Sequence, residues 1–182
     1  CSYNVWDITR LFRLESSGRE REEIEIDFAE ISGRGLPCLP AHLEAGDYES
    51  YLVVLPASIL KRLYDSFGQR LLEQNVRTFL QFRGNVNKGM RVTLENEPEM
   101  FFAYNNGITA TAERVEVERS GAAVVIQKIK NLQIVNGGQT TAAVSLAGDN
   151  ENVDLTKVFV QMKLSVIERK RSEEVVPRIS EY

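Results

Sequence analysis

The stretch NLQIVNGGQTT, residues 131–141, has the residue types best suited to binding an anion. Its polar and glycine positions are Asn136, Gly137, Gly138, Gln139, Thr140 and Thr141. A strand that ends in two glycines and leads into a helix leaves backbone N–H groups at the positive end of the helix dipole. Such groups bind phosphate, and glycine lets a ligand approach the backbone closely. The alternative is a plain turn whose polar side chains only cap the helix.

The spacing of these residues does not decide between the two interpretations. It matches neither G-x-x-x-x-G-K-[ST] nor G-x-G-x-x-G, and no lysine follows the glycines to meet a terminal phosphate. An established class of nucleotide-binding loop is therefore not indicated.

A second corner, FFAYNNGITATA, places Asn105 and Asn106 before Gly107, at the start of an expected strand that includes Thr109. Asn-Asn-Gly suits a turn with positive φ. The same two carboxamides could instead donate to and accept from the edge of a base or sugar. Both interpretations stay open for this corner.

Charge is distributed unevenly along the chain. The net charge of −4 and the pI near 5.2 argue against a protein whose whole surface binds nucleic acid. A basic cluster between Lys61 and Arg91 is nevertheless a candidate for phosphate contacts, which we assign to Arg83, Lys88 and Arg91. The alternative is a solvated helix face, because acidic residues follow directly.

The sequence indicates no catalytic residues and no metal site. The single histidine, His42, and the two cysteines, Cys1 and Cys38, have no ligand spacing and no triad partners. Glu97 and Glu99 could hold Mg²⁺ for a nucleotide hydrolase, but surface charges explain them better. Whether the chain is an enzyme, and which cofactor it would use, stays undecided.

Hydrophobic periodicity indicates an α+β fold with a mixed, largely antiparallel sheet and flanking helices. Helices are expected at 3–16, 57–68, 90–95, 139–146 and 171–182, the last with Pro177 inside it. Strands are expected at 22–31, 48–56, 107–118, 122–129, 132–135 and 157–168. Residues 33–40 should form a loop because of their glycines and prolines, and Ser120-Gly121 a hairpin turn.

Domain organisation and location are also expected from the sequence. We predict that residues 1–47 form an N-terminal helix and strand, as a separate subdomain, and that residues 48–182 form the core domain. No apolar run is long enough to span a membrane, and no signal peptide is visible, so we expect a cytoplasmic protein. The abrupt ends suggest a fragment of a longer polypeptide, truncated at the C-terminal end of the core domain.

Two motifs in order, FFAYNNGITATA and NLQIVNGGQTTAAV, resemble the hallmark of the AIPR (abortive infection phage resistance) family. The similarity extends over most of the chain from about Tyr48. It implies a protein of bacterial defence against phage. The resemblance also implies a nuclease-like segment upstream, as in many family members, and the Asn/Gln-rich stretch that usually follows downstream. This sequence contains neither of them. By analogy, NGGQTT is also similar to the corner of ParB/sulfiredoxin-like domains, which implies a core of that kind.

Two functions of different classes follow. In the first, the corner at 136–141 forms a phosphate-facing wall, and Asn105, Asn106 and Thr109 form the opposite wall of a site for a nucleotide or nucleic acid. In the second, the chain is a non-catalytic module that positions a nuclease domain or senses a phage component. Expected partners are a nucleotide or nucleic acid and the rest of the same polypeptide, while self-association stays open.

Overall fold

The computed structural model describes residues 23–41, 48–73, 76, 88–121 and 123–180. The expected helix at 3–16, His42 and Arg83 lie outside these residues. The strands are β1 (Glu25–Asp27), β2 (Leu36–Pro40), β3 (Glu49–Pro56), β4 (Ile108–Ala112), β5 (Arg114–Ser120), β6 (Ala123–Lys130), β7 (Gln133–Asn136) and β8 (Phe159–Val166). The helices are α2 (Phe28–Ser32), α3 (Ala57–Phe67), α5 (Lys88–Asn96), α6 (Phe101–Tyr104), α7 (Gly138–Gly148) and α8 (Arg169–Ser180), with 3₁₀ turns η1 (Gly68–Leu71), η2 (Pro98–Met100) and η3 (Leu155–Lys157).

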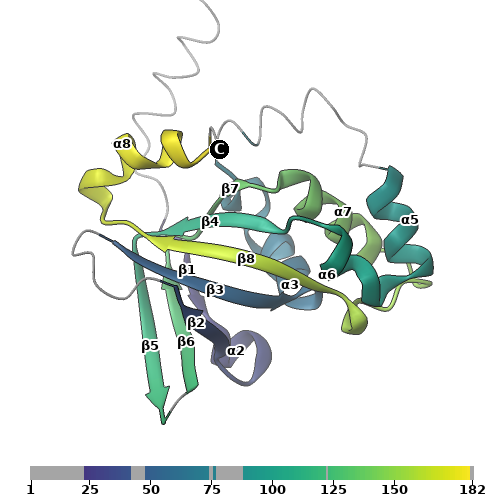
Figure 1. The fold of residues 1–182 in the computed structure, drawn as a ribbon, viewed down its shortest axis with the longest axis horizontal. Helices are drawn as coiled ribbons and strands as arrows, with labels where there is room; N and C mark the ends of the chain where they lie inside the picture. Colours follow the sequence, from purple (N-terminus) through teal and green to yellow (C-terminus); the bar gives the residue numbers. More distant parts are fainter. Residues whose placement is uncertain (1–22, 42–47, 74–75, 77–87, 122, 181–182) are drawn as a thin grey trace, which may run out of the picture.

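The eight strands form one curled sheet in the order β1-β6-β2-β3-β8-β4-β7, and β5 pairs with β6 (Figure 1). Strands β4 and β8 run parallel, with Ile108 opposite Met162. The other strand pairs are antiparallel. This arrangement confirms the α+β class and the mixed, largely antiparallel sheet.

Strand β8 lies between β3 and β4 in the middle of the sheet, although it is the last of these strands in the sequence (Figure 1). It pairs with β3 from Pro56 opposite Phe159 to Glu49 opposite Val166. Its residues alternate between buried (Val160, Met162) and exposed (Gln161, Lys163) positions. The sheet therefore has an inner face towards the core and an outer face.

The core lies on the inner face, where α3 and α7 pack against the sheet and against each other. Buried aliphatic side chains from β3, β4, β8 and the two helices fill it, among them Leu55, Leu60, Ala110 and Val144. Burial of such side chains contributes about 1.5–3 kcal/mol each to the free energy of folding. Helix α8 lies near β7 at one end of the sheet and buries Val176 (Figure 1).

Two expectations for the N-terminal part of the sheet are wrong. Residues 22–31 do not form one strand, because Asp27 accepts hydrogen bonds from the N–H groups of Ala29 and Glu30 and so begins α2. Residues 33–40 do not form a loop throughout. Leu36–Pro40 is strand β2, which pairs with β6 on one side and with β3 on the other.

Other elements lie close to where the sequence predicts them. Helix α3 ends before Gly68, α7 covers the expected 139–146, and α8 contains Pro177. The expected strand at 107–118 is divided at Glu113 into β4 and β5. Strands β1 and β2 belong to the same sheet as β3–β8, and the separate subdomain over residues 1–47 stays a prediction.

Candidate functional site

The two Asn/Gly corners lie side by side at one end of the sheet. Strand β4 begins where β7 ends, because the two strands are antiparallel, and Thr109 lies opposite Asn136. Asn106 and Gly107 directly precede β4, and Gly137 directly follows β7. The pairing of β4 with β7 thereby brings two segments about 30 residues apart in the sequence next to each other.

Close backbone packing requires glycine at both corners. Gly137 has φ +93°, and a Cβ built on it would lie 2.7 Å from the carbonyl oxygen of Gly107. Gly107 has φ +76°, and a Cβ there would lie 2.1 Å from the carbonyl oxygen of Gln161 in β8. Side chains rarely adopt such φ values, and no Cβ fits at these distances. The two glycines therefore allow the backbones of the two corners and of β8 to pack directly against one another.

Several predicted ligand side chains make hydrogen bonds within the protein. The amide of Asn105 donates to the carbonyl of Phe101 at 3.0 Å, at the end of α6. Thr140 and Thr141 are buried, and their hydroxyl groups donate to the carbonyls of Gly107 (3.5 Å) and Gly137 (3.2 Å). These contacts hold the corners in place, so a ligand would have to compete with them.

The remaining predicted residues differ in exposure. Asn106 and Asn136 are exposed, Thr109 and Gln139 are half-buried, and Gly138 is buried. Asn136 Oδ1 accepts a hydrogen bond from the N–H of Gly137 at 2.7 Å. No side chain of the described residues caps the first turn of α7.

Cross-strand pairing adds a residue that sequence reasoning missed. Thr109 lies opposite Asn136 on one side and opposite Lys163 of β8 on the other. Paired residues project from the same face of a sheet, so Asn136, Thr109 and Lys163 form a row across β7, β4 and β8. We call these three residues together with Asn106 the polar row. The alternation in KVFVQMKLSV indicates that Lys163 is outward-facing, but not which strand lies beside it.

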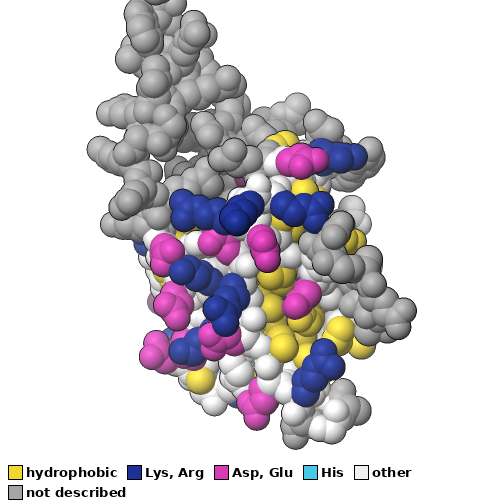
Figure 2. Space-filling model, turned by 90° about the vertical axis from the view of Figure 1, so that its left-hand side faces the viewer, with side chains coloured by type: hydrophobic (Ala, Val, Ile, Leu, Met, Phe, Trp, Pro, Cys, Tyr) yellow, Lys and Arg dark blue, Asp and Glu magenta, His cyan; other side chains and the backbone are white. Residues whose placement is uncertain are grey.

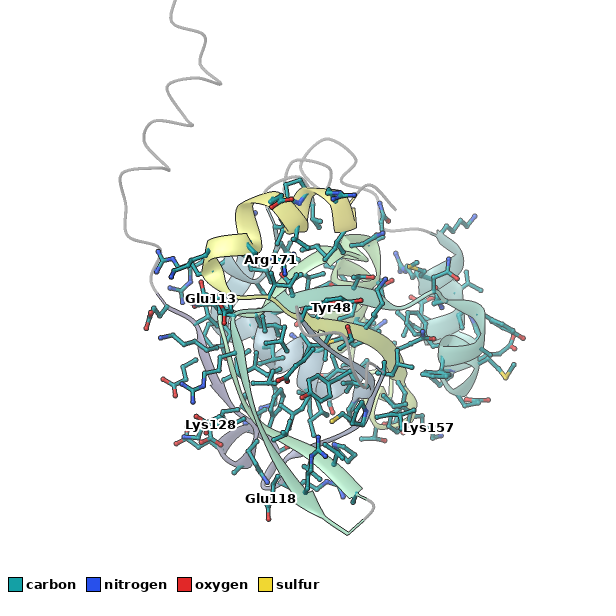
Figure 3. The ribbon with its side chains drawn as sticks, turned by 60° about the vertical axis from the view of Figure 1, so that its left-hand side comes forward. Tyr48, Glu113, Glu118, Lys128, Lys157 and Arg171 are labelled. Atoms are coloured by element: carbon teal, nitrogen blue, oxygen red, sulfur yellow. The ribbon has the colours of Figure 1, made fainter. Side chains whose placement is uncertain are left out.

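Lys163 is exposed and takes part in none of the ion pairs formed among the described residues. Some cations elsewhere in the described chain are paired with carboxylates. Lys128 and Lys130 of the β5–β6 hairpin, for example, pair with Asp27 and Glu23. Basic and acidic side chains are interspersed over that face of the molecule (Figures 2 and 3). Lys163 is thus a positive charge without an ion-pair partner among the described residues, and it lies beside the corners.

The predicted phosphate-binding residues Lys88 and Arg91 lie on α5 and are not part of the polar row. Lys88 is exposed at the start of α5, and Arg91 pairs with Glu95 through Nε and Oε1 at 2.8 Å. Helix α5 packs against α6 and α7 rather than on the outer face of the sheet. Among the described residues, no group of three or more His, Cys, Asp or Glu side chains has metal-binding geometry.

The sequence model of the AIPR family matches residues 72–182, which is more than half of the chain. The chain belongs to the AIPR family. The matched region contains β4–β8 and α5–α8, and hence both corners and all of the polar row. Family membership indicates a role in abortive infection, a form of defence against phage. No curated protein and no solved structure matches this AIPR chain.

The more specific expectation of a ParB/sulfiredoxin-like core stays a prediction. In the described part of this AIPR chain, no helix is long and apolar enough to cross a membrane.

Proposed function

We propose that this AIPR core binds a nucleotide or a nucleic-acid phosphate at the polar row, the four residues Asn106, Thr109, Asn136 and Lys163. The proposal is carried by one observation: strand pairing brings the two corners together and adds Lys163 to them. The contact would be made on the outer face of the sheet, and α7 would only support it.

The chemistry of these side chains suits such a ligand. The Lys163 ammonium group offers three donors and a positive charge for a phosphate oxygen. The carboxamides of Asn106 and Asn136 can donate to and accept from a base edge or a ribose hydroxyl. Thr109 lies between Asn136 and Lys163 in the row, and its hydroxyl can donate to or accept from the same ligand.

A second function has its own support. The hydrogen bonds of Asn105, Thr140 and Thr141 within the protein are those of a well-packed structural corner. A non-catalytic module that positions a nuclease domain or senses a phage component would use these corners only as rigid turns. Binding measurements on the polar row distinguish the two functions.

The test is calorimetric titration of the purified protein with nucleoside triphosphates and with short single- and double-stranded DNA and RNA. Replacing Lys163 by Ala should weaken binding at least about tenfold, because a phosphate contact is lost, and should lower the salt dependence by about one counterion. Lys157→Ala is the matched control, since Lys157 is also exposed but belongs to η3 and pairs with Asp154 (Figure 3).

Each result has a clear consequence. Loss of affinity in Lys163→Ala and Asn136→Ala, with affinity retained in Lys157→Ala, supports ligand binding at the polar row. Absence of binding by the unaltered protein, or unchanged affinity in both polar-row variants, supports the structural module instead. Thermal unfolding should be nearly unchanged in all three variants, because the side chains are exposed.

A further inference from the structure

The polar row continues into an apolar surface on the outer face of the sheet. Lys163 of β8 lies opposite Leu52 of β3, and Leu52 lies opposite Leu39 of β2. Directly paired residues project from the same face of a sheet. One line of outward side chains therefore crosses β7, β4, β8, β3 and β2, from Asn136 through Lys163 to Leu39.

Exposed apolar side chains gather beside Lys163 in a surface that we call the apolar strip: Leu39, Leu52, Val54 and Phe159. They are 63%, 39%, 53% and 40% exposed, in that order. Leu52 and Val54 are two residues apart on β3, and Val54 lies opposite Gln161, which is two residues from Phe159 on β8. Neighbours at these spacings are within reach of one another. A contiguous exposed apolar surface commonly marks a binding site, whereas single exposed apolar residues are ordinary.

Strand β8 presents three kinds of side chain in succession on the outer face. Phe159, Gln161 and Lys163 are exposed, and Val160 and Met162 between them are buried. An aromatic ring, an amide and an ammonium group thus follow one another at every second residue, and Phe159 and Lys163 lie about 13 Å apart along the strand. The ring can stack on a base, the amide can bond to a base edge, and the ammonium group can contact a phosphate.

A second cation lies towards the other end of the apolar strip. The strip borders an open hollow of about 550 Å³, and the exposed Arg34 borders the same hollow. Because β2 and β3 are antiparallel, the chain just before Leu36 lies towards Pro56, the residue of β3 that pairs with Phe159. Arg34 forms no ion pair with another described residue. Positive charge is therefore present at both ends of the strip, from Lys163 and from Arg34.

We propose that the ligand of the polar row is single-stranded nucleic acid, whose bases stack on Phe159 and cover the apolar strip while its phosphates contact Lys163 and Arg34. Aromatic side chains combined with cations along one surface are the usual means by which proteins bind single strands. This inference rests on the proposed function, because it names the class of ligand that the same site takes.

The chemistry of the strip favours a single strand over a duplex or a mononucleotide. In a duplex the base faces are stacked inside, and affinity comes mainly from many phosphate contacts, for which Lys163 and Arg34 are too few. A single strand can turn its bases towards the apolar side chains and its phosphates towards both cations. A mononucleotide has a single base, so it would leave much of the strip exposed to water.

The first test uses the unaltered protein and fluorescence anisotropy with labelled oligonucleotides. Short single strands of DNA and of RNA should each be compared with a duplex of the same sequence and with an abasic DNA strand of the same length. We expect the single strands to bind at least about fivefold more tightly than the abasic strand, because stacking on the bases is lost in the latter. The duplex should also bind more weakly. The DNA and RNA arms show which sugar the site prefers.

The second test removes the aromatic ring. Phe159→Ala should weaken binding of the single strand at least about fivefold and leave binding of the abasic strand unchanged, whereas Phe159→Tyr should bind the single strand as the unaltered protein does. Arg34→Ala should weaken binding of both strands, because a phosphate contact is lost. Leu146→Ala is the matched control, since Leu146 is 60% exposed on α7, which packs on the inner face of the sheet. Its affinity should equal that of the unaltered protein.

Two results would overturn this inference and leave the proposed function intact. One is equal affinity for the single strand, the duplex and the abasic strand, with binding still weakened in Lys163→Ala. The other is unchanged affinity in a Phe159→Ala variant whose circular dichroism is that of the unaltered protein. Absence of nucleic-acid binding by the unaltered protein would also overturn it, while nucleoside triphosphate binding that is lost in Lys163→Ala would still support a site at the polar row.

Discussion

Gly107 has two separate reasons to be glycine. Its φ of +76° is costly for any residue with a Cβ, and its backbone is in contact with the carbonyl oxygen of Gln161. Gly121, in the β5–β6 turn, has a similar φ of +59° but has open space around it. Comparing substitutions at Gly107 and Gly121 therefore separates the cost of an unfavourable backbone conformation from the cost of a steric clash.

We predict that Gly107→Ala lowers the free energy of unfolding by about 3 kcal/mol and Gly121→Ala by only about 1 kcal/mol. The larger loss comes from pushing β8 away from the corner, in addition to the unfavourable φ. Chemical denaturation of the two variants measures the difference. Equal losses would show that Gln161 moves aside without cost.

Single residues also show what sequence reasoning could and could not find. The Asn, Gly and Thr residues of the two corners are visible as turn-forming and polar types, and their presence at strand ends was predictable. Their hydrogen-bond partners were not, because Thr140 bonds to a carbonyl 33 residues away. Lys163 was missed for the same reason, since only the register of β4 against β8 places it beside Thr109.

Among the elements, Lys61 in the middle of α3 joins that helix to the C-terminal end of α7. Lys61 Nζ of α3 lies 2.8 Å from Asp149 Oδ1, beyond the end of α7, and 2.9 Å from Asp65 Oδ2. The bond to Asp149, followed by the bond to Asp65, raises the pKa of Lys61 above its usual value. A raised pKa means that the pair stabilises the fold while Lys61 is charged.

The pH dependence of this link is the prediction at the scale of elements. Asp149→Asn should lower the midpoint of thermal unfolding at pH 7–9, by an amount worth no more than about 1 kcal/mol because Asp149 is largely exposed. The stabilisation is present below the unfolded pKa of Lys61, near 10.5, and is lost as the pH rises through the higher folded pKa. The difference between variant and unaltered protein should therefore shrink above about pH 10.5.

Thermal scans from pH 7 to pH 12 measure that difference. Glu151→Gln is the control, because Glu151 is exposed and makes no ion pair with the described residues. A difference for Asp149→Asn that stays constant across the whole range would show that Lys61 does not carry the effect.

The elements with strong local signals were predictable, and those that depend on tertiary context were not. Helix α3, with apolar residues at helical spacing and Gly68 after it, was expected at nearly its true bounds. Strand β2 was expected to be a loop because Pro37 and Pro40 disfavour strands. Pairing with β6 and β3 on either side overrides that local preference. The prediction of one strand over residues 22–31 is wrong because the side chain of Asp27 caps a helix, α2, that begins within the alternating pattern.

At the scale of the whole molecule, β8 holds the sheet together. It pairs with β3 on one side and β4 on the other, and no other strand of the described chain links those two. Without β8, both neighbours would present unpaired edges, and unpaired edges promote aggregation. The proposed ligand site depends on the same strand, because Lys163 belongs to β8.

We predict that a chain ending at Val158 does not unfold cooperatively and aggregates, whereas a chain ending at Glu168 folds. The second chain keeps β8 and loses only α8, so it should be less stable but should retain the sheet. Far-ultraviolet circular dichroism during urea unfolding, with light scattering, compares the two. A cooperative transition in the shorter chain would show that β3 and β4 can pair without β8.

The late position of β8 in the sequence has a consequence during protein synthesis. About 100 residues separate the end of β3 from the start of β8, and at elongation rates of about 5–20 residues per second these take roughly 5–20 s to translate. The free edge of β3 is accordingly open to chaperones on the ribosome for that time. A defence protein assembled in this order would acquire its proposed binding surface only after most of the nascent chain has emerged.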